Sequence, residues 1–241
     1  MSRRSERSER RLFLAEGRNA VEAALEAGVV LEVFATPARD DLLPGMPDGV
    51  PLTLVDERAL KALTDAVTPA GVVALCRFVD VPLEQALAGG YVALLAHVSD
   101  PGNAGTVIRC ADASGAGGVV LAGSSVDLYN AKTIRASAGS AFHVPVATGV
   151  DAVAAVAAAR EAGYQVLSTE ADGDLDLFDA DEVLARPTVW LFGNEAHGLT
   201  PELAALADHR VRIPIHGRAE SLNLSTAAAL CLYASARAQR G

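Results

Sequence analysis

The chain has 241 residues and a mass of 24.8 kDa, and with 51% hydrophobic and 21% charged residues it can bury a sizeable core. Its formal net charge is −10, and residues 1–12 hold five arginines against two glutamates, so the remainder carries −13. An acidic body argues against a protein that grips nucleic acid by bulk charge alone.

The cysteine and hydropathy patterns exclude other classes. The three cysteines lie far apart in sequence, so we expect neither a disulfide framework nor a cysteine-rich zinc site, and a reducing cytoplasm is the expected compartment. No apolar run reaches the ~18 residues that a membrane span needs, so no membrane association is expected. The first residues lack the apolar segment of a secretory signal.

The charge and hydropathy pattern of the N-terminal third of the chain predicts a tail followed by a small α/β domain. We expect a flexible basic arm over residues 1–12 and a small α/β domain over residues 13–79. Within that domain a helix is predicted in residues 16–27, ended by Gly28, and another over 57–64, capped by Asp56. Strands are predicted at 29–35, 50–55 and 72–78, and the proline-rich residues 37–51 favour a loop.

A linker with one helical turn is predicted over residues 80–90, and strands and helices alternate from residue 91 to residue 241. The predicted strands are 91–98, 117–121, 144–147, 164–168, 188–192 and 211–215, and the predicted helices are 104–114, 131–137, 152–162, 201–206 and 222–237. Continuous apolar strands between helices favour an α/β fold with a mostly parallel sheet covered on both faces. Ligands bind such sheets where loops leave the carboxyl ends of strands.

Three of those loops have unusual composition. Residues 99–105 read Ser-Asp-Pro-Gly-Asn-Ala-Gly, where Asn103 could cap the next helix, and Arg109 follows six residues later. Taken alone, this loop is also compatible with a turn followed by a surface arginine. In residues 191–201 a strand ends at Gly193, where a ligand or backbone could approach closely, before the polar Asn194 and Glu195.

An ordinary strand–turn–helix connection explains Thr200 and Pro201 as the helix start, but not the two glycines that flank an amide and an acid. The third loop, residues 213–225, passes from Ile-Pro-Ile to Ser-Leu-Asn-Leu-Ser. Either Ser221 or Asn223 could simply cap the final helix.

Together the three loops resemble the sequence motifs of the SpoU (TrmH-like) branch of the SPOUT RNA methyltransferases, over roughly residues 89–241. The shared patterns are N-x-G-x-x-x-R, then G-N-E-x-x-G-L, then I-P-I followed by S-L-N-x-S. Residues 16–19 and 69–73 resemble the small ribosomal-protein-like substrate-binding domain that is often fused to this branch. The resemblance implies a deep trefoil knot in the C-terminal part, which periodicity cannot reveal.

The resemblance also implies a function: transfer of a methyl group from S-adenosylmethionine to a ribose 2′-hydroxyl of rRNA or tRNA, by a homodimer with its active sites at the subunit interface. The implied catalytic residues are Asn103, Arg109, Glu195, Ser221 and Asn223. The implied cofactor-binding residues are Thr169, Leu191, Gly193, Asn194, Ile213, Ile215, Ser221 and Leu222. His197 lies at a variable position of the motif and reads as a surface side chain.

RNA contacts must be local, because the body is acidic. The expected RNA-binding residues are Arg18, Asn19, Arg109, Lys132, Arg135 and Arg218, although a solvated helix face would also explain the i, i+3 pair of Lys132 and Arg135. A guanidinium stays protonated, so we expect Arg109 to bind an RNA phosphate and lower the pKa of the hydroxyl, with the proton leaving to Glu195 or water.

Competing functions lack their motifs. No G-x-G-x-x-G follows a strand, no G-x-x-x-x-G-K-[ST] loop occurs, and no metal-ligand spacing or G-x-S-x-G elbow is present, so no metal is expected. Two alternatives stay open: a non-catalytic RNA-binding or assembly protein on the same scaffold, and a base methyltransferase of a sister branch. Retention of all five implied catalytic residues argues against the first, and the S-L-N pattern argues against the second.

Overall fold

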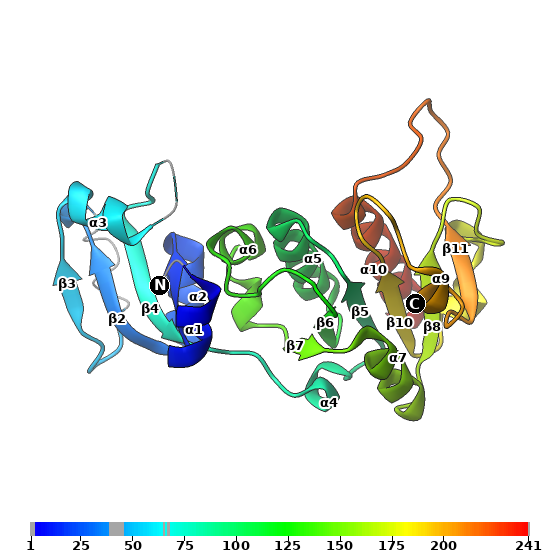
Figure 1. Ribbon diagram of the computed structural model, residues 1–241, viewed down its shortest axis with the longest axis horizontal. Helices are drawn as coiled ribbons and strands as arrows, with labels where there is room; N and C mark the ends of the chain where they lie inside the picture. The colour runs from blue at the N-terminus through cyan, green and yellow to red at the C-terminus, as the bar shows by residue number, and fades with distance from the viewer. Residues whose placement is uncertain (1–2, 39–45, 65, 67, 241) are drawn as a thin grey trace.

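The computed structural model describes residues 3–38, 46–64, 66 and 68–240. Two sheets lie side by side along the long axis of the molecule, the smaller one formed by the N-terminal part of the chain (Figure 1). The segment between them carries one helical turn, α4 (Leu83–Ala86), as predicted for the linker. The α/β fold class expected from the sequence is confirmed.

The small domain is built on a four-stranded sheet with the order β1-β4-β2-β3. Its strands are β1 (Leu12–Glu16), β2 (Val30–Ala35), β3 (Leu52–Leu54) and β4 (Val72–Arg77). The sheet is mixed, because β4 runs antiparallel to both of its neighbours whereas β3 is parallel to β2. Helix α2 (Arg18–Glu26) buries Val21 and Ala24, and α3 (Glu57–Leu63) starts at Asp56, whose carboxylate accepts the predicted capping bond from Ala59 N–H.

The N-terminal residues differ from the flexible arm that the sequence predicts. Helix α1 (Arg4–Arg10) forms instead, and β1 begins at Leu12. The side chain of Arg7 is only 8% exposed. It forms an ion pair with Asp127 of the large domain, with 2.6 Å between Nη2 of Arg7 and Oδ2 of Asp127. A helix this short is unstable in isolation, so tertiary contacts of this kind must hold it. The partner lies 120 residues away in sequence, beyond the reach of local patterns.

The large domain has a seven-stranded sheet with the order β7-β6-β5-β10-β8-β11-β9. Its strands are β5 (Tyr91–Ala96), β6 (Gly118–Ala122), β7 (Val146–Val150), β8 (Gln165–Thr169), β9 (Leu175–Asp176), β10 (Thr188–Phe192) and β11 (His209–Arg212). Every pairing in this sheet is parallel. All residues of β5, β6 and β10 are buried, as continuous apolar runs predict.

Helices cover both faces of this sheet. On one face pack α5 (Pro101–Ser114), α6 (Ala131–Ser137), α8 (Asp181–Leu184) and α10 (Leu224–Arg240), with 3₁₀ turns η2 (Ser140–Phe142) and η3 (Leu177–Asp179). On the other pack α4, α7 (Ala152–Glu161) and α9 (Pro201–Ala204). Alternate residues of β5 enter the two cores, Leu95 on the first face and Leu94 on the second.

Two details of the large domain depart from the sequence-based prediction. Strand β9 and helix α8 are extra, because residues 175–184 carry short elements that hydrophobic periodicity does not resolve. Helix α5 begins at Pro101 rather than near Asn103, since Asp100 is its N-cap and accepts a hydrogen bond from Asn103 N–H.

The two domains share a packed interface around Tyr129. The ring of Tyr129 stacks on Phe78 with centroids 3.6 Å apart and lies 4.7 Å from that of Phe13. Its hydroxyl accepts hydrogen bonds from Val79 N–H and Asp80 N–H, both at 2.7 Å. The core of the small domain therefore continues into that of the large one.

Candidate active site

The turn between β5 and α5 is the first part of the site. Asp100 caps α5, and its other carboxylate oxygen lies 3.0 Å from Nζ of Lys132 on α6. The pKa of Asp100 is lowered by the hydrogen bond from Asn103 N–H and by Lys132. The turn keeps its shape because both ends of the Asp100 side chain are held.

The hairpin that follows β10 is the second part, and its carboxylate joins the two loops. Glu195 accepts hydrogen bonds from Ser99 N–H at 3.0 Å and Asp100 N–H at 2.9 Å. It also accepts from Ser99 Oγ at 3.1 Å and from Asn103 Nδ2 at 3.2 Å. These four bonds link segments more than 90 residues apart in sequence.

The start of α10 is the third part. Asn223 Nδ2 donates to Asn103 Oδ1 at 2.9 Å, while Asn223 Oδ1 accepts from Ser225 N–H at 2.9 Å. Asn223 thus caps α10, as the simpler interpretation of the sequence had it, and at the same time contacts the first turn. Asn103 has its carbonyl held by the third loop and its amide held by the second, so its orientation is fixed.

The protonation state of Glu195 follows from these contacts. Partial burial raises the pKa of the Glu195 carboxyl, but the hydrogen bonds from the backbone of Ser99 and Asp100 and from the Asn103 amide outweigh it. The pKa therefore lies below its ordinary value, and the group is a carboxylate at neutral pH. A carboxylate with four donors around it is a poor acceptor for a further proton.

Gly193 and Asn194 shape the hairpin that follows β10. Asn194 and Gly198 exchange two backbone hydrogen bonds of 2.9 and 2.8 Å, and Asn194 Nδ2 donates to the carbonyl of His97. A Cβ on Gly193 would lie 2.2 Å from the carbonyl carbon of Gly198 and 2.4 Å from Leu199 N. Only glycine fits there, because backbone occupies the space.

A small pocket lies beside the third loop and contains five of the predicted cofactor-binding residues. Its volume is about 160 Å³, and it is lined by Thr169, Ile213, Ile215, Ser221, Leu222, Val211, Ala227, Glu170, Ala171 and Glu220. Leu222 lines the pocket and the next residue, Asn223, belongs to the polar network, so the third loop contributes to both. The walls are mainly apolar, with hydroxyls from Thr169 and Ser221.

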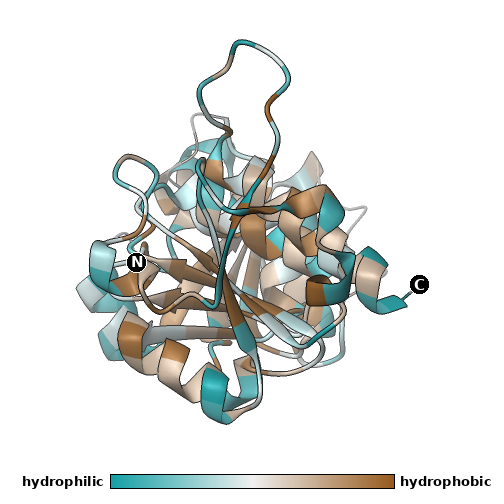
Figure 2. Ribbon diagram, turned by 90° about the vertical axis from the view of Figure 1, so that its right-hand side faces the viewer, coloured by the Kyte–Doolittle hydropathy of each residue, from teal (hydrophilic) through white to brown (hydrophobic). Residues whose placement is uncertain are grey.

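The loop over residues 213–223 is the open side of this pocket. It projects from the body of the molecule at the top of Figure 1 and of Figure 2. Ile215 and Leu222 are 38% and 37% exposed, and residues 216–223 are all exposed. Small-molecule sites usually enclose about 300–1,000 Å³. A pocket of this size must therefore gain walls, from this loop or from a second protomer, to enclose a nucleoside-sized ligand.

The remaining predicted residues are dispersed. Leu191 is fully buried in the sheet, and its core lies on the face covered by α7 and α9. Arg109 is exposed on α5, with no hydrogen bond or ion pair to any described residue. Arg218 is exposed in the projecting loop.

The other RNA-binding candidates lie where the two domains meet. Arg135 Nη1 is 2.8 Å from Oε2 of the buried Glu16, and Arg18 pairs with Glu22 within α2. Arg135, Glu16, Arg18 and Asn19 are among the residues that line a hollow of about 320 Å³. The pair Lys132 and Arg135 is therefore not a freely solvated helix face, since both side chains hold neighbouring segments.

Sequence reasoning missed several contributors. The backbone N–H groups of Ser99 and Asp100 anchor Glu195, and an aspartate before a proline at a helix start is the signal that could have identified Asp100. Glu170 and Glu220 also line the pocket, and no local sequence signal pointed to them, because only the fold brings them there. Among the described residues no group of three or more His, Cys, Asp or Glu is arranged to bind a metal. No described helix is long and apolar enough to cross a membrane.

Comparisons with known proteins cover nearly the whole chain. Residues 90–233 match the SpoU rRNA Methylase family, and residues 1–74 match the MRM3-like substrate binding domain. The chain is 32% identical to the 23S rRNA (guanosine(2553)-2'-O)-methyltransferase RlmP of Bacillus subtilis, over 95% of this chain and 90% of that protein.

Solved structures agree with the sequence matches. The SpoU methyltransferase AviRb from Streptomyces viridochromogenes in complex with the cofactor AdoMet has a TM-score of 0.85 and 32% identity, covering 99% of this chain and 94% of that one. An AdoMet-bound rRNA methyltransferase from Sinorhizobium meliloti has a TM-score of 0.84 and 35% identity, covering 98% and 91%. The similarity extends over both domains, including the small one.

Proposed function

Because this chain belongs to the SpoU rRNA methylase family, we propose that it transfers the methyl group of S-adenosylmethionine to a ribose 2′-hydroxyl of ribosomal RNA. The observation that carries this proposal is the hydrogen-bonded chain from Glu195 through Asn103 to Asn223, which unites three separate loops at the carboxyl ends of the strands. A protein that only bound RNA would have no need of that network beside an apolar pocket.

The pocket beside the third loop fits the cofactor in kind. Its apolar walls suit the adenine ring and a sulfonium that loses its charge during transfer, and Thr169 and Ser221 offer hydroxyls for polar contacts. When bound, S-adenosylmethionine supplies the activated methyl group. Ile215 and Leu222 would bury their exposed apolar surface against the bound cofactor, and this burial would favour closure of the projecting loop.

In this proposal Asn103 faces the reacting ribose, and the network fixes its orientation. Glu195 anchors the turn through two backbone N–H groups and holds the Asn103 amide, and Asn223 holds the carbonyl. We assign Glu195, Asn223 and Ser221 to positioning the turn and the cofactor, with Asn103 the group that contacts substrate. Orientation of this kind supplies a large part of the rate of an in-line transfer.

Arg109 supplies positive charge where the RNA backbone is expected. It has no partner among the described residues of its own chain, so its five donors are available to a phosphate. Phosphate binding beside the ribose would place positive charge near the departing proton and lower the pKa of the hydroxyl. Because Glu195 is already saturated with donors, water is the better proton acceptor.

We propose further that the protein acts as a homodimer in the cytoplasm. Helix α10 packs along α5 and exposes Tyr233, 53% accessible, with Leu230 one turn before it. Arg109 is exposed on α5, so a second copy that covered the exposed side chains of both helices would bring Arg109 toward the partner's site. The implied knot stays a prediction of the family resemblance.

Two measurements test the function. Calorimetric titration of the protein with S-adenosylmethionine should give one site per chain, whereas a non-catalytic assembly protein would give no heat. Ribose methylation mapped across rRNA and tRNA of a deletion strain should show one lost 2′-O-methyl group, restored by the wild-type gene but not by Asn103→Ala. Loss of a base methyl group instead would identify a base methyltransferase.

A further inference from the structure

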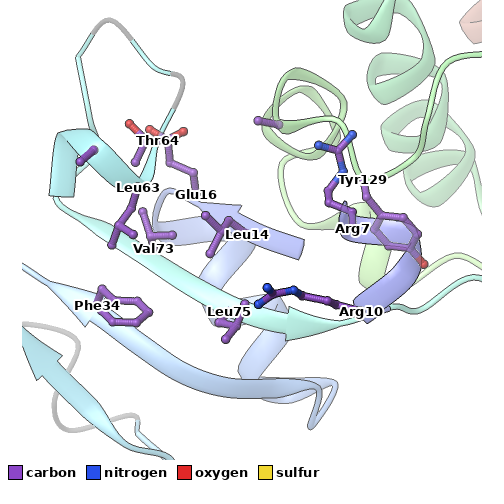
Figure 3. A pocket seen from close by; sticks show the side chains of 12 residues that line it. Arg7, Arg10, Leu14, Glu16, Phe34, Leu63, Thr64, Val73, Leu75 and Tyr129 are labelled. Atoms are coloured by element: carbon purple, nitrogen blue, oxygen red, sulfur yellow. The ribbon is translucent and has the colours of Figure 1, made fainter. Parts of the chain in front are cut away.

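A second pocket, larger than the one beside the three loops, lies where the two domains meet. It has a volume of about 360 Å³ and lies between the small sheet, α1 and the start of α6 (Figure 3). Its lining residues are Arg7, Arg10, Leu14, Glu16, Phe34, Ala62, Leu63, Thr64, Val73, Leu75, Tyr129 and Ala131. Below it is called the interdomain cleft.

The floor of the cleft is an apolar sheet surface. Leu14, Phe34 and Leu75 come from β1, β2 and β4, and all three are only partly buried, although they lie on the face of the sheet opposite α2. Figure 3 shows Phe34 and Leu75 along one side of the opening. A flat apolar floor with one aromatic ring is the kind of surface on which an unpaired base stacks.

The rim carries polar groups of two kinds. Arg10 is mostly exposed, and Figure 3 shows its side chain reaching from α1 toward Leu75. Thr64 lines the opposite wall, and its buried hydroxyl oxygen has no hydrogen-bond partner among the described residues. A buried hydroxyl without a partner is costly, so it marks a place where a polar ligand atom would be stabilising.

Charge favours a polyanion at this cleft. Two of the five arginines in residues 3–12 line the cleft. Arg7 is paired with Asp127, whereas Arg10 lies 3.9 Å from Glu6 and keeps 62% of its side chain exposed, so Arg10 supplies the accessible positive charge. The neighbouring hollow with Arg18 and Arg135 shares Glu16 with the cleft. A chain of phosphates could therefore pass from one to the other along basic side chains.

The first turn of α6 contributes to both the cleft and the candidate active site. Ala131 lines the cleft, and the next residue, Lys132, is bonded to Asp100 in the turn that carries Asn103. One RNA strand could thus occupy the cleft and the active site together, with Lys132 between them.

We propose that the interdomain cleft binds an unpaired nucleotide of the substrate RNA, with its base stacked on Phe34, its edge bonded to Thr64 Oγ1 and its phosphate near Arg10. The inference rests on the proposed function, since it makes the cleft a second contact for the same RNA. It defines the substrate as a single-stranded loop or bulge in which a base outside the target nucleotide is flipped out. The cleft then selects the target by holding the strand at a fixed distance from Asn103.

Affinity for a short oligouridylate labelled with fluorescein, compared with an RNA duplex of equal length, tests the proposal in the full-length protein. Phe34→Leu keeps the apolar floor but removes the stacking ring, and should weaken binding of the single strand about tenfold with little change for the duplex. Phe178→Leu is the matched control, because Phe178 is 55% exposed at the far edge of the large sheet. An equal affinity of Phe34→Leu and Phe178→Leu proteins for the single strand would overturn the proposal.

The Thr64→Val variant distinguishes an RNA contact of Thr64 from a purely structural role, because the two predict different combinations of unfolding temperature and RNA affinity. It removes a hydroxyl that has no partner among the described residues, so the free protein should unfold at an unchanged or higher temperature while the single strand binds several-fold more weakly. A lower unfolding temperature together with unchanged RNA affinity would contradict the assigned contact.

Photo-crosslinking locates the base directly. An oligonucleotide with 5-iodouridine should crosslink to Phe34 or Tyr129, and crosslinks confined to other residues would argue against the cleft. S-adenosylmethionine titrations of the same proteins separate the two hypotheses. If the Phe34→Leu protein binds the cofactor and transfers the methyl group as the wild-type protein does, the proposal for the cleft is rejected and the proposed function is not. If the wild-type protein does not bind the cofactor, the proposed function is rejected.

Discussion

The two halves of the candidate active site differ in how firmly the free protein holds them. The half built from Asn103, Glu195 and Asn223 is tied by hydrogen bonds between all three loops. The half around Ile215 and Leu222 has exposed apolar side chains on a projecting loop. We infer from this comparison that the groups proposed to orient the reaction are set before ligands arrive, whereas the walls proposed to enclose the cofactor are completed by binding.

Removing the central side chain of the rigid half should have the largest effect. Asn103→Ala loses the contacts to both Glu195 and Asn223, so we expect kcat to fall about 10²–10³-fold while the affinity for S-adenosylmethionine changes less than about threefold. Single-turnover kinetics and calorimetry measure the two quantities. His197→Ala, at an exposed residue of the same hairpin, is the control and should leave both unchanged.

The role of Arg109 can be tested across subunits. Arg109→Lys keeps the charge but loses the planar fork, and we expect kcat/KM to fall about tenfold or more. If the residue serves the partner's site, mixing inactive Arg109→Ala and Asn103→Ala proteins should restore about a quarter of wild-type activity through hybrid dimers. Near wild-type turnover by Arg109→Lys would exclude bidentate phosphate binding, and no restoration in the mixture would place Arg109 in its own site.

Changes in the open half should affect binding instead. Ile215→Ser with Leu222→Ser removes apolar surface that is exposed in the free protein, so the unfolding temperature should hardly change. The dissociation constant for S-adenosylmethionine should rise about tenfold, since each side chain would otherwise be buried in the complex. Unchanged affinity would show that the loop does not close over the cofactor.

The smallest effect concerns pH. The pKa of Glu195 is lowered in the folded protein, so its stabilising contribution is present above the ordinary carboxyl pKa, near about 4.3, and is lost as the pH falls through the folded value. Wild type should therefore exceed Glu195→Gln in unfolding temperature at neutral pH, and the difference should shrink in acid. A difference that grows on acidification would contradict the assignment of a carboxylate.

The sequence predicted more of the candidate site than of the interface between the domains. The three motifs identified Asn103, Glu195 and Asn223, because each motif is local and carries its own residue pattern. From the sequence, Asn103 was the candidate N-cap of α5, whereas the structure has Asp100 in that position. Both residue types cap helices, so only the coordinates distinguish them.

The cleft and the folded N-terminus were beyond local patterns for a physical reason. Arg7 is held by Asp127, and the cleft collects side chains from β1, β2, α3, β4 and α6. Contacts between segments so distant in sequence leave no periodic signal in any one of them. The domain boundaries predicted at residues 12, 79 and 90 likewise stay predictions, although the basic segment before residue 12 proves to be part of the packed structure.

The most direct test of the account is the chemical identity of the methylated product. Unmodified 23S rRNA incubated with the protein and methyl-labelled S-adenosylmethionine, then digested to nucleosides, should yield the label in a single 2′-O-methylnucleoside, and Asn103→Ala should slow its incorporation about 10²–10³-fold. Label on a base, or no label with wild-type protein that binds the cofactor, would contradict the claim that the three loops direct the methyl carbon to a ribose oxygen.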